Sequence, residues 1–250
     1  MAKEKKMWIY GTHAVLSVLK NAHRKCHRLL ITENTQSSLE KALSALDPKV
    51  STITEVMDRR EIDRLLPQDT RHQGIAAEVS PLRELSLEDI CDQEGDSLVM
   101  LLDQVTDPHN VGAILRSAHA FGAHALITTE RNSPSVEGTI AKTASGALEH
   151  LPLVTVTNLA RAMDHLKQSN FWCIGLDERG EASIEKTDLT GRIALIMGAE
   201  GKGLRRLTRE NCDILSHLPT VGSFSTLNVS TSAAISLYES ARQRAQKQGM

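Results

Sequence analysis

The chain has 250 residues and a mass of 27.4 kDa, a length that favours one large domain or two. Hydrophobic residues make up 40% and charged residues 24%, which excludes a disordered, collagen-like or coiled-coil chain. Uninterrupted apolar runs are short, such as residues 98–102, so we expect no membrane span. The basic start is followed by no signal-peptide cleavage pattern, which predicts a cytoplasmic protein.

The formal net charge is only −2, but the charges are unevenly distributed along the chain. Residues 1–28 contain seven Lys or Arg against one acid, whereas residues 84–107 contain eight acids and no Lys or Arg. The basic stretch is able to contact phosphates or to form an ordinary solvated surface, and the sequence leaves both open. Aromatic residues at 3% exclude a base-stacking sheet, and four widely spaced cysteines predict free thiols rather than disulfides or a metal site.

In the first part of the chain, hydrophobic periodicity alternates between helix and strand patterns. The expected elements are a helix at 12–20, a strand at 28–32, a helix at 39–46, a strand at 50–54, a helix at 59–66 and a strand at 74–79. This alternation predicts a small α/β domain over residues 1–79. Residues 80–96 contain a proline, several acids and little periodicity, so we expect a linker there.

The second part, residues 97–250, alternates more strongly. The expected strands lie at 98–102, 125–128, 153–156, 171–176, 193–197 and 214–218, and the expected helices at 111–121, 139–148, 159–168, 204–211 and 229–246. Repeated strand–helix units with wholly apolar strands predict a parallel sheet with helices on both faces. Sites in such folds gather in the loops after the carboxyl ends of strands. Three of these loops carry unusual side chains.

The first loop and the helix after it cover residues 103–116. Asn110 is expected to cap the helix, which by itself is an ordinary structural role. Gly112 and Arg116 are one turn apart and so are expected on one face. An arginine in an otherwise apolar helix is either a functional residue or a rim residue paired with an acid.

The second loop, GAEGKG, covers residues 198–203 after a buried strand. Gly198 and Gly203 permit backbone amides to approach a ligand, although a tight turn without a ligand also explains them. The spacing matches neither the dinucleotide nor the triphosphate fingerprint. Glu200 is poorly suited to a phosphate cradle and better suited to accepting hydrogen bonds or holding a cation.

The third loop, LPTVGSFSTLNVS, covers residues 218–230 and leads into the last helix. Its dense hydroxyl and amide side chains, Asn228 among them, are explained either by an elaborate helix cap or by a binding site, and the sequence leaves both open. A cap does not require Leu227, a bulky apolar residue inside a polar loop. We therefore expect Leu227 to pack on an adenine-like ring.

Together, NVGAILRSA, IALIMGAEGKGLRRLT and LPTVGSFSTLNVS closely resemble, in order and spacing, the three motifs of the SpoU/TrmH family of RNA ribose 2′-O-methyltransferases. IYGTHAV and RHQGI in the first part also resemble the N-terminal domain of members that act on 23S rRNA. The resemblance implies a C-terminal trefoil-knotted α/β methyltransferase domain preceded by a small α/β RNA-binding domain. It also implies a homodimer that transfers methyl groups from S-adenosyl-L-methionine to a guanosine of 23S rRNA, without a metal or a membrane.

Carried over by position, the resemblance assigns catalytic roles to four polar residues, Asn110, Arg116, Glu200 and Asn228. It assigns cofactor binding to Gly198, Gly203, Leu218 and Leu227. Thr226 stands where relatives usually have serine. It keeps the hydroxyl and adds a methyl group.

Other functions remain open at this point. A tRNA ribose 2′-O-methyltransferase would share the motifs. A non-catalytic rRNA-binding assembly factor would keep the fold and charge pattern, but it would not need the glycine turn, Glu200 and Leu227 together. A small-molecule enzyme on a nucleotide-binding fold would not need the basic first domain.

Overall fold

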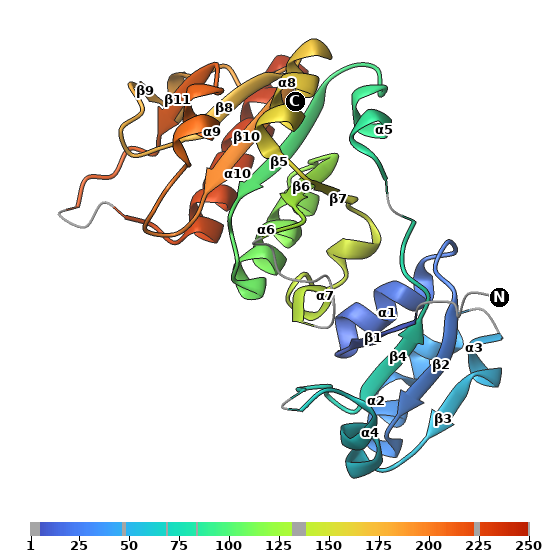
Figure 1. Cartoon of the computed structure of the whole chain (residues 1–250). Coiled ribbons are helices and arrows are strands. Elements are labelled where there is room, and N and C mark those ends of the chain that lie inside the picture. The colour runs from blue at the N-terminus through green and yellow to red at the C-terminus, as the bar shows by residue number, and fades with distance from the viewer. Residues whose placement is uncertain are drawn as a thin grey trace. The chain divides into compact units, whose positions relative to one another are not determined.

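The computed structural model describes residues 6–46, 49–68, 70–83, 85–131, 139–222 and 226–249 (Figure 1). The chain divides into two compact units, one formed by Met1–Arg83 with Ser135–His150 and the other by Glu84–Pro134 with Leu151–Met250. Each unit has its own sheet, of four strands in the first and seven in the second. The α/β class expected from the sequence is confirmed.

The small unit has a mixed sheet in the order β1-β4-β2-β3, in which β4 runs antiparallel to both neighbours and β3 runs parallel to β2. Its strands are β1 (Met7–Tyr10), β2 (Cys26–Ile31), β3 (Thr54–Val56) and β4 (Ile75–Val79), and its first four helices are α1 (Thr12–Lys20), α2 (Glu33–Ser44), α3 (Lys49–Thr52) and α4 (Arg59–Leu65). The apolar runs of the strands form its core, with Leu29, Leu30 and Ile31 fully buried.

The strand expected at residues 50–54 is wrong, because this stretch begins with the short helix α3 and only then enters β3. The run of β-branched residues favours a strand. However, the hydroxyls of Thr52 and Thr54 donate to the carbonyls of Lys49 and Val50, both at 2.7 Å. Such bonds to carbonyls three and four residues back are typical of a helical turn, and they compensate for the poor propensity.

The segment that begins at residue 139 belongs to the small unit, although it lies inside the expected second domain. The expected helix at 139–148 is broken into α7 (Thr139–Thr143) and the 3₁₀ turn η1 (Ala147–Glu149). Ser145 and Gly146 separate them with φ values of 51° and 94°. The Glu149 side chain is 3% exposed, lies 3.9 Å from Arg24 and accepts a 2.9 Å hydrogen bond from Asn21. These buried polar contacts explain why the segment packs with residues 1–83.

The large unit contains a seven-stranded sheet in the order β7-β6-β5-β10-β8-β11-β9, and every neighbouring pair is parallel. Its strands are β5 (Ser97–Asp103), β6 (Ala125–Thr129), β7 (Leu153–Val156), β8 (Trp172–Leu176), β9 (Ala182–Ser183), β10 (Arg192–Gly198) and β11 (Ile214–His217). Its helices are α5 (Leu87–Cys91), α6 (Pro108–Ala120), α8 (Leu159–Gln168), η2 (Ile184–Lys186), α9 (Arg206–Glu210) and α10 (Val229–Lys247). The expected parallel sheet is confirmed, and the short elements β9, η2 and α5 are additions.

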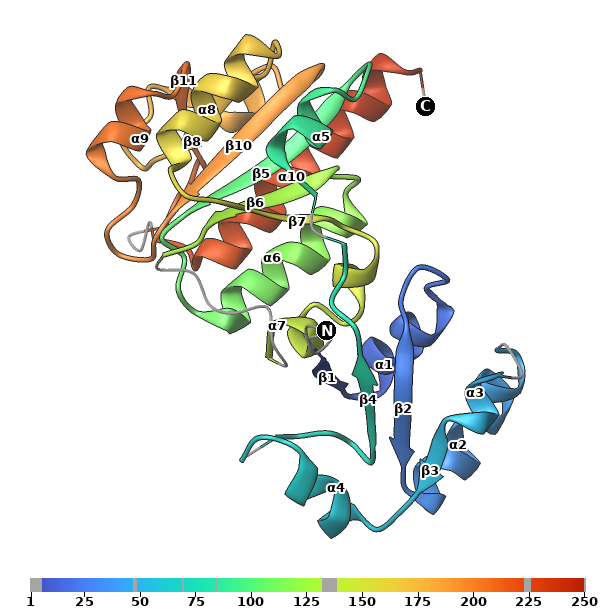
Figure 2. The same ribbon diagram turned by 45° about the vertical axis from the view of Figure 1, so that its right-hand side comes forward.

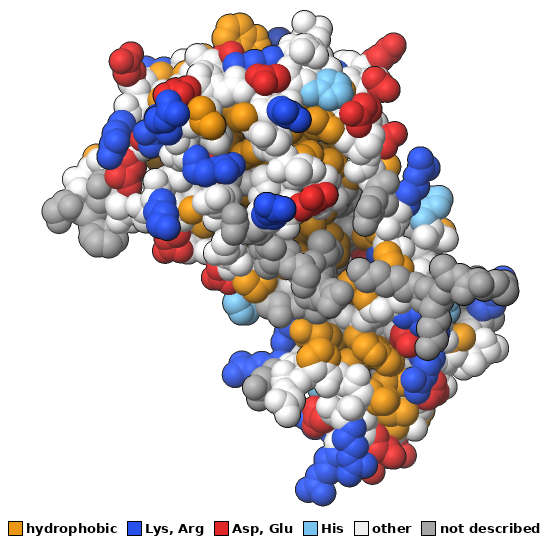
Figure 3. Space-filling view, in the orientation of Figure 1, with side chains coloured by type: hydrophobic (Ala, Val, Ile, Leu, Met, Phe, Trp, Pro, Cys, Tyr) orange, Lys and Arg blue, Asp and Glu red, His pale blue; other side chains and the backbone are white. Residues whose placement is uncertain are grey.

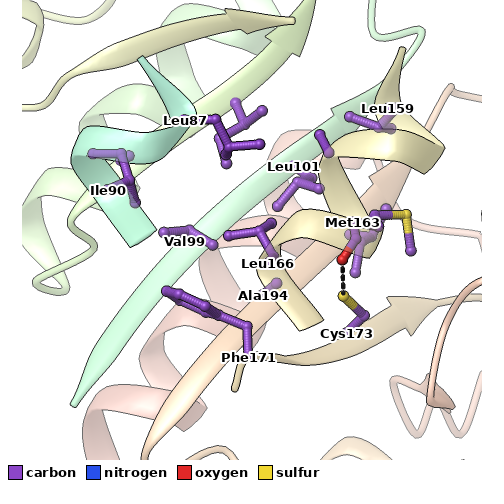
Figure 4. Close-up of a cluster of buried hydrophobic side chains, with 14 of the residues drawn as sticks. Leu87, Ile90, Val99, Leu101, Leu159, Met163, Leu166, Phe171, Cys173 and Ala194 are labelled. Carbon is purple, nitrogen blue, oxygen red and sulfur yellow. Dashed lines mark hydrogen bonds between the residues drawn. The ribbon is translucent and has the colours of Figure 1, made fainter. Parts of the chain in front are cut away.

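Helices cover both faces of this sheet (Figure 2). On one face, α5 and α8 bury alternate strand residues in the cluster drawn in Figure 4, where Val99 and Leu101 meet Met163 and Leu166. On the other face α6 and α10 lie side by side. Because both faces of the sheet are buried, the sequences of β5 and β10 are almost continuously apolar.

Helix α5 lies within the stretch expected to be a linker. Ser86 caps it and forms a capping box with Asp89, so the acidic residues there include a helix start signal. Leu87, Ile90 and Cys91 are buried in the core of the large unit. Part of the expected linker is therefore an element of the large unit.

All four cysteines are free thiols, as the sequence indicates. Burial raises the pKa of Cys26 to about 11 and the pKa values of Cys173 and Cys212 to about 12. These three thiols are therefore protonated at neutral pH. Among the described residues, no helix has the length and apolar character needed to cross a bilayer, and no group of His, Cys, Asp and Glu side chains is arranged to hold a metal.

Candidate active site

The three unusual loops lie at the carboxyl edge of the large sheet. Gly198 at the end of β10 pairs with Asp103 at the end of β5, so the first two loops start beside each other. Arg244, near the end of α10, donates to the carbonyls of Ser97 and Gly191 at the opposite, amino edge. The part of α10 between Arg244 and Val229 is roughly 24 Å long, at 1.5 Å per residue, and it runs along the strands. Its first residues therefore reach the carboxyl edge. The cap of α10 therefore lies at the same edge as the other two loops.

The glycine loop after β10 folds back on itself. The Gly203 amide donates a 2.8 Å hydrogen bond to the Ala199 carbonyl, and these two residues form an isolated antiparallel bridge. A Cβ atom on Gly198 would lie 2.1 Å from the Gly203 carbonyl carbon and 2.3 Å from the Leu204 nitrogen. Gly198 is therefore required for the loop to close, whatever the loop binds. Gly203 has a φ of 65°, which favours glycine for a separate reason.

Asp103 fixes this loop to the end of β5. Its side chain is fully buried and accepts two hydrogen bonds from Arg205, one from the backbone nitrogen at 2.9 Å and one from Nε at 2.5 Å. Asp103 is not among the site residues predicted from the sequence. The available signal was a carboxylate that directly ends a strand of five apolar residues.

Arg205→Ala is expected to lower the free energy of unfolding by about 1–3 kcal/mol, because the buried Asp103 carboxylate loses a charged partner. Arg206→Ala is the matched control, since the Arg206 side chain is 75% exposed and pairs with Glu210 on the same helix. Its loss is expected to cost less than about 0.5 kcal/mol. Urea denaturation of both variants measures the difference. Equal effects would show that the buried pair does not hold the loop.

The first loop differs from its expected form. Helix α6 begins at Pro108, and Asp107 rather than Asn110 is the cap, with its carboxylate accepting from the His109 amide at 2.8 Å. The proline at the first helical position and the aspartate before it are the signals in the sequence that start the helix here. Asn110 lies within the first turn and is 9% exposed. A buried polar side chain in the first turn is not explained by capping.

Arg116 lies farther along α6 and is exposed, whereas Gly112 one turn earlier is buried. Among the described residues Arg116 forms no ion pair, so the rim arginine paired with an acid is not what the structure contains. Glu200 is also exposed and makes no ion pair with any described residue. Both charged groups are therefore available to a ligand, and the chain does not join them to each other.

The third loop is described only in part, since residues 223–225 lie outside the described ranges. Leu218 is half-buried, and Leu227 is 41% exposed beside the exposed Thr226. Asn228 caps α10, with its Oδ1 accepting from the Ser230 amide at 2.8 Å and the Ser230 hydroxyl at 2.6 Å. Asn228 therefore caps the helix, the structural role that the sequence left open beside a functional one.

Comparison with known proteins decides what these loops belong to. The model of the SpoU rRNA methylase family matches residues 97–238. The chain belongs to the SpoU rRNA methylase family. A second family model, described as RNA 2′-O ribose methyltransferase substrate binding, matches residues 8–85 of this SpoU chain.

Curated relatives of this SpoU protein match it along almost its whole length. The 23S rRNA (guanosine-2′-O-)-methyltransferase RlmB of Pseudomonas putida is 43% identical over 240 residues, covering 94% of this chain and 96% of the relative. RlmB of Escherichia coli K12 is 41% identical over 240 residues, covering 94% and 98%. The SpoU methyltransferase AviRb from Streptomyces viridochromogenes, solved in complex with AdoMet, superposes with a TM-score of 0.79 at 28% identity, covering 96% and 91% of the two chains.

The small unit of the SpoU chain carries exposed positive charge outside residues 1–28 as well as within them. In residues 1–28, Lys6 pairs with Glu78 at 3.1 Å, Arg28 pairs with Glu55 at 2.7 Å, and the Arg24 side chain is only 1% exposed. Five described arginines of the small unit are exposed and in no ion pair: Arg83 after β4, and Arg59, Arg60, Arg64 and Arg71 on α4 and the loop after it. Figure 3 shows Lys and Arg side chains over this part of the small unit.

Proposed function

We propose that this protein transfers a methyl group from S-adenosyl-L-methionine to the ribose 2′-hydroxyl of a guanosine in 23S rRNA. The observation that carries the proposal is the identity of 41–43% to RlmB enzymes over nearly the whole of both chains. Similarity confined to the sheet would support only a methyltransferase fold. Similarity that also includes the small unit supports the same class of substrate.

The residues at the carboxyl edge fit the proposed cofactor. The closed loop around Gly198 leaves no room for a side chain where the chain turns back, so the backbone forms the wall there. Half-buried Leu218 and partly exposed Leu227 offer apolar surface for an adenine ring, while Gly203 keeps the loop backbone accessible. We assign cofactor binding to these four residues. When bound, the cofactor supplies an electrophilic methyl group on a sulfonium.

The protein must supply the rest of the chemistry, because a ribose hydroxyl is too weakly acidic to attack unaided at neutral pH. We assign to Arg116 the stabilisation of the developing alkoxide and of an adjacent phosphate, because a guanidinium is a poor proton acceptor. Glu200 is assigned to receive the proton through water or to orient Arg116 when RNA is bound. Asn110 and Asn228 complete the proposed polar set at the helix starts.

We further propose that the enzyme is a cytoplasmic homodimer with a trefoil knot in the large unit. Support for association comes from α10. Its Ala233 and Leu237 side chains are fully buried within the unit, but Ile235 is 41% and Tyr238 55% exposed. Tyr238 packs edge-on against Phe121 at the end of α6 with a centroid distance of 5.9 Å, so both helices contribute to this exposed apolar surface.

RNA binding by the small unit is proposed to depend on α4. Arg60→Ala with Arg64→Ala is expected to reduce the slope of log affinity against log salt by about 1.4, since each phosphate contact on a single strand contributes about 0.7. Lys6→Ala with Arg28→Ala removes the same charge from paired positions and is expected to change the slope less. Fluorescence anisotropy of a labelled rRNA fragment at several salt concentrations gives both slopes. An equal loss in the two doubles would contradict this assignment.

The activity itself is tested with the purified full chain, labelled cofactor and a 23S rRNA transcript, with a tRNA transcript as the comparison substrate. We expect the label in 23S rRNA and, after digestion, in 2′-O-methylguanosine. Label in tRNA alone would replace the proposal by a tRNA methyltransferase. Cofactor binding without transfer to either RNA would also contradict it, and absence of cofactor binding would favour an assembly factor.

A further inference from the structure

Trp172 is unusually exposed for its position in the fold. It is the first residue of β8, whose other residues are buried, yet Trp172 is 58% exposed. The chain contains only two tryptophans. Exposure of an indole to water is unfavourable, so a tryptophan held at the surface by a buried strand is a natural place to look for a ligand.

A hollow of about 240 Å³ lies beside this indole, lined by Lys167, Asn170, Phe171, Trp172 and Asp213. The Lys167 ammonium lies 2.9 Å from Asp213 Oδ1, and Asp213 Oδ2 accepts a 2.8 Å hydrogen bond from the Cys173 amide. The carboxylate is therefore fixed in place by the strand and by the lysine. Its side chain keeps 26% exposure, so it can still accept further hydrogen bonds.

Several contacts hold the residues around the hollow in place. Phe171 is 3% exposed and carries the Arg192 guanidinium 4.3 Å from its ring centroid. Arg192 in turn donates to the Cys91 carbonyl at 2.8 Å, which holds it against α5. Asn170 turns the chain into β8 with a φ of 64°, a conformation that asparagine tolerates, and its side chain is exposed. Phe171 and Arg192 therefore form a packed wall beside the hollow.

The hollow is separate from the candidate active site. Trp172 starts β8 at the amino edge of the sheet, while the glycine loop and the caps of α6 and α10 lie at the carboxyl edge. None of the residues that line it belongs to the proposed catalytic or cofactor set.

We propose that this hollow binds an unpaired nucleobase of the RNA substrate, stacked on the indole of Trp172. A flat aromatic face supplies sequence-tolerant stacking. Beside it, Asp213 accepts hydrogen bonds from base N–H groups, Asn170 both donates and accepts, and Lys167 donates. An aromatic platform bordered by acceptors and donors matches the face and the edge of a base. The proposal rests on the proposed function in that RNA is the substrate, and it adds a contact remote from the methylated ribose.

The first test uses tryptophan fluorescence of the full chain. Trp8→Phe leaves Trp172 as the only indole, and this variant is titrated with a 23S rRNA fragment that contains unpaired bases and with a fully paired duplex. Stacking is expected to quench the emission with the fragment and to leave it nearly unchanged with the duplex. Equal quenching by both RNAs, or no quenching by a fragment that is bound, would overturn the proposal.

The second test measures affinity. Trp172→Ala is expected to weaken binding of the fragment roughly tenfold, and Trp172→Phe, which keeps a stacking ring, much less. Leu207→Ala on α9 is the matched control, because Leu207 is also a large exposed hydrophobic residue, at 61%, in the same unit. Cofactor binding by isothermal titration is expected to stay unchanged in all three variants, which shows that the unit is folded.

The outcomes separate this proposal from the proposed function. Methyl transfer to 23S rRNA with unaltered affinity in Trp172→Ala would overturn the nucleobase site and leave the function standing. Loss of affinity to the same extent in Trp172→Ala and Trp172→Phe would also overturn it, because stacking would then not be the interaction. If no RNA is methylated but the fragment still quenches Trp172, the function fails and the site remains.

Discussion

Arg116→Ala is expected to lower the turnover number for methyl transfer by a factor on the order of 10² to 10³, the range typical of removing one donor to a developing oxyanion. Arg116 is exposed and forms no ion pair with any described residue, so its replacement removes no ion pair that stabilises α6. The affinity for S-adenosyl-L-methionine is therefore expected to change little. Single-turnover rates with saturating RNA and cofactor, beside a cofactor titration, measure the two quantities separately.

Arg116→Lys is the companion variant, and we expect it to restore activity only in part. An ammonium keeps the charge but cannot bridge a hydroxyl and a phosphate as a planar guanidinium does. A raised KM for RNA with unchanged turnover would make Arg116 a binding contact and end its catalytic assignment. Parallel losses of turnover and cofactor affinity would instead indicate a structural role.

Gly198→Val is expected to abolish binding of S-adenosyl-L-methionine while the large unit stays folded. Even a Cβ atom at this position would come within 2.1 Å of the Gly203 backbone, so the loop that closes at the Ala199–Gly203 bridge has to open. Isothermal titration measures the binding, and circular dichroism checks the fold.

Gly201→Ala is the matched control within the same loop. A Cβ atom there meets nothing within 4 Å, although the φ of 75° makes the substitution mildly strained. We expect reduced but measurable cofactor affinity for this variant. Near-normal affinity in Gly198→Val would show that the cofactor is bound elsewhere. A stronger loss in Gly201→Ala than in Gly198→Val would point to backbone strain rather than loop closure.

Much of the large unit was predictable from the sequence because its strands are buried on both faces. The apolar run Leu98–Leu102 is too short for a helix and is followed by helical periodicity, which favours a buried strand. Helix α8 at Leu159–Gln168 lies where its pattern places it. The secondary structure of the small unit was harder to predict at residues 50–54, because local hydrogen bonds of two threonines outweigh the β propensity there. The place of residues 139–150 was not predictable, because it depends on contacts of Glu149 with residues more than 100 positions away.

The candidate site was also predictable from the sequence only in part. The loops were recognisable from their residue types and from the position of strands, and the cap of α10 at Asn228 followed from local rules. The cap of α6 lies three residues before the predicted Asn110, because Asp107 and Pro108 start the helix earlier. The hydrogen bonds between Asp103 and Arg205 join residues that are 102 positions apart in the chain. Hydrophobic periodicity does not predict such a pairing.

The central claim is that the protein methylates a guanosine ribose in 23S rRNA. Its most direct test is ribose-methylation mapping of rRNA from a strain that lacks the gene, from the parent, and from the strain complemented with the full chain or with Arg116→Ala. We predict that one 2′-O-methylguanosine of 23S rRNA disappears in the deletion, returns with the full chain and does not return to the parental level with the variant. An unchanged 23S rRNA methylation map in the deletion strain, with or without a change in tRNA, would contradict the claim.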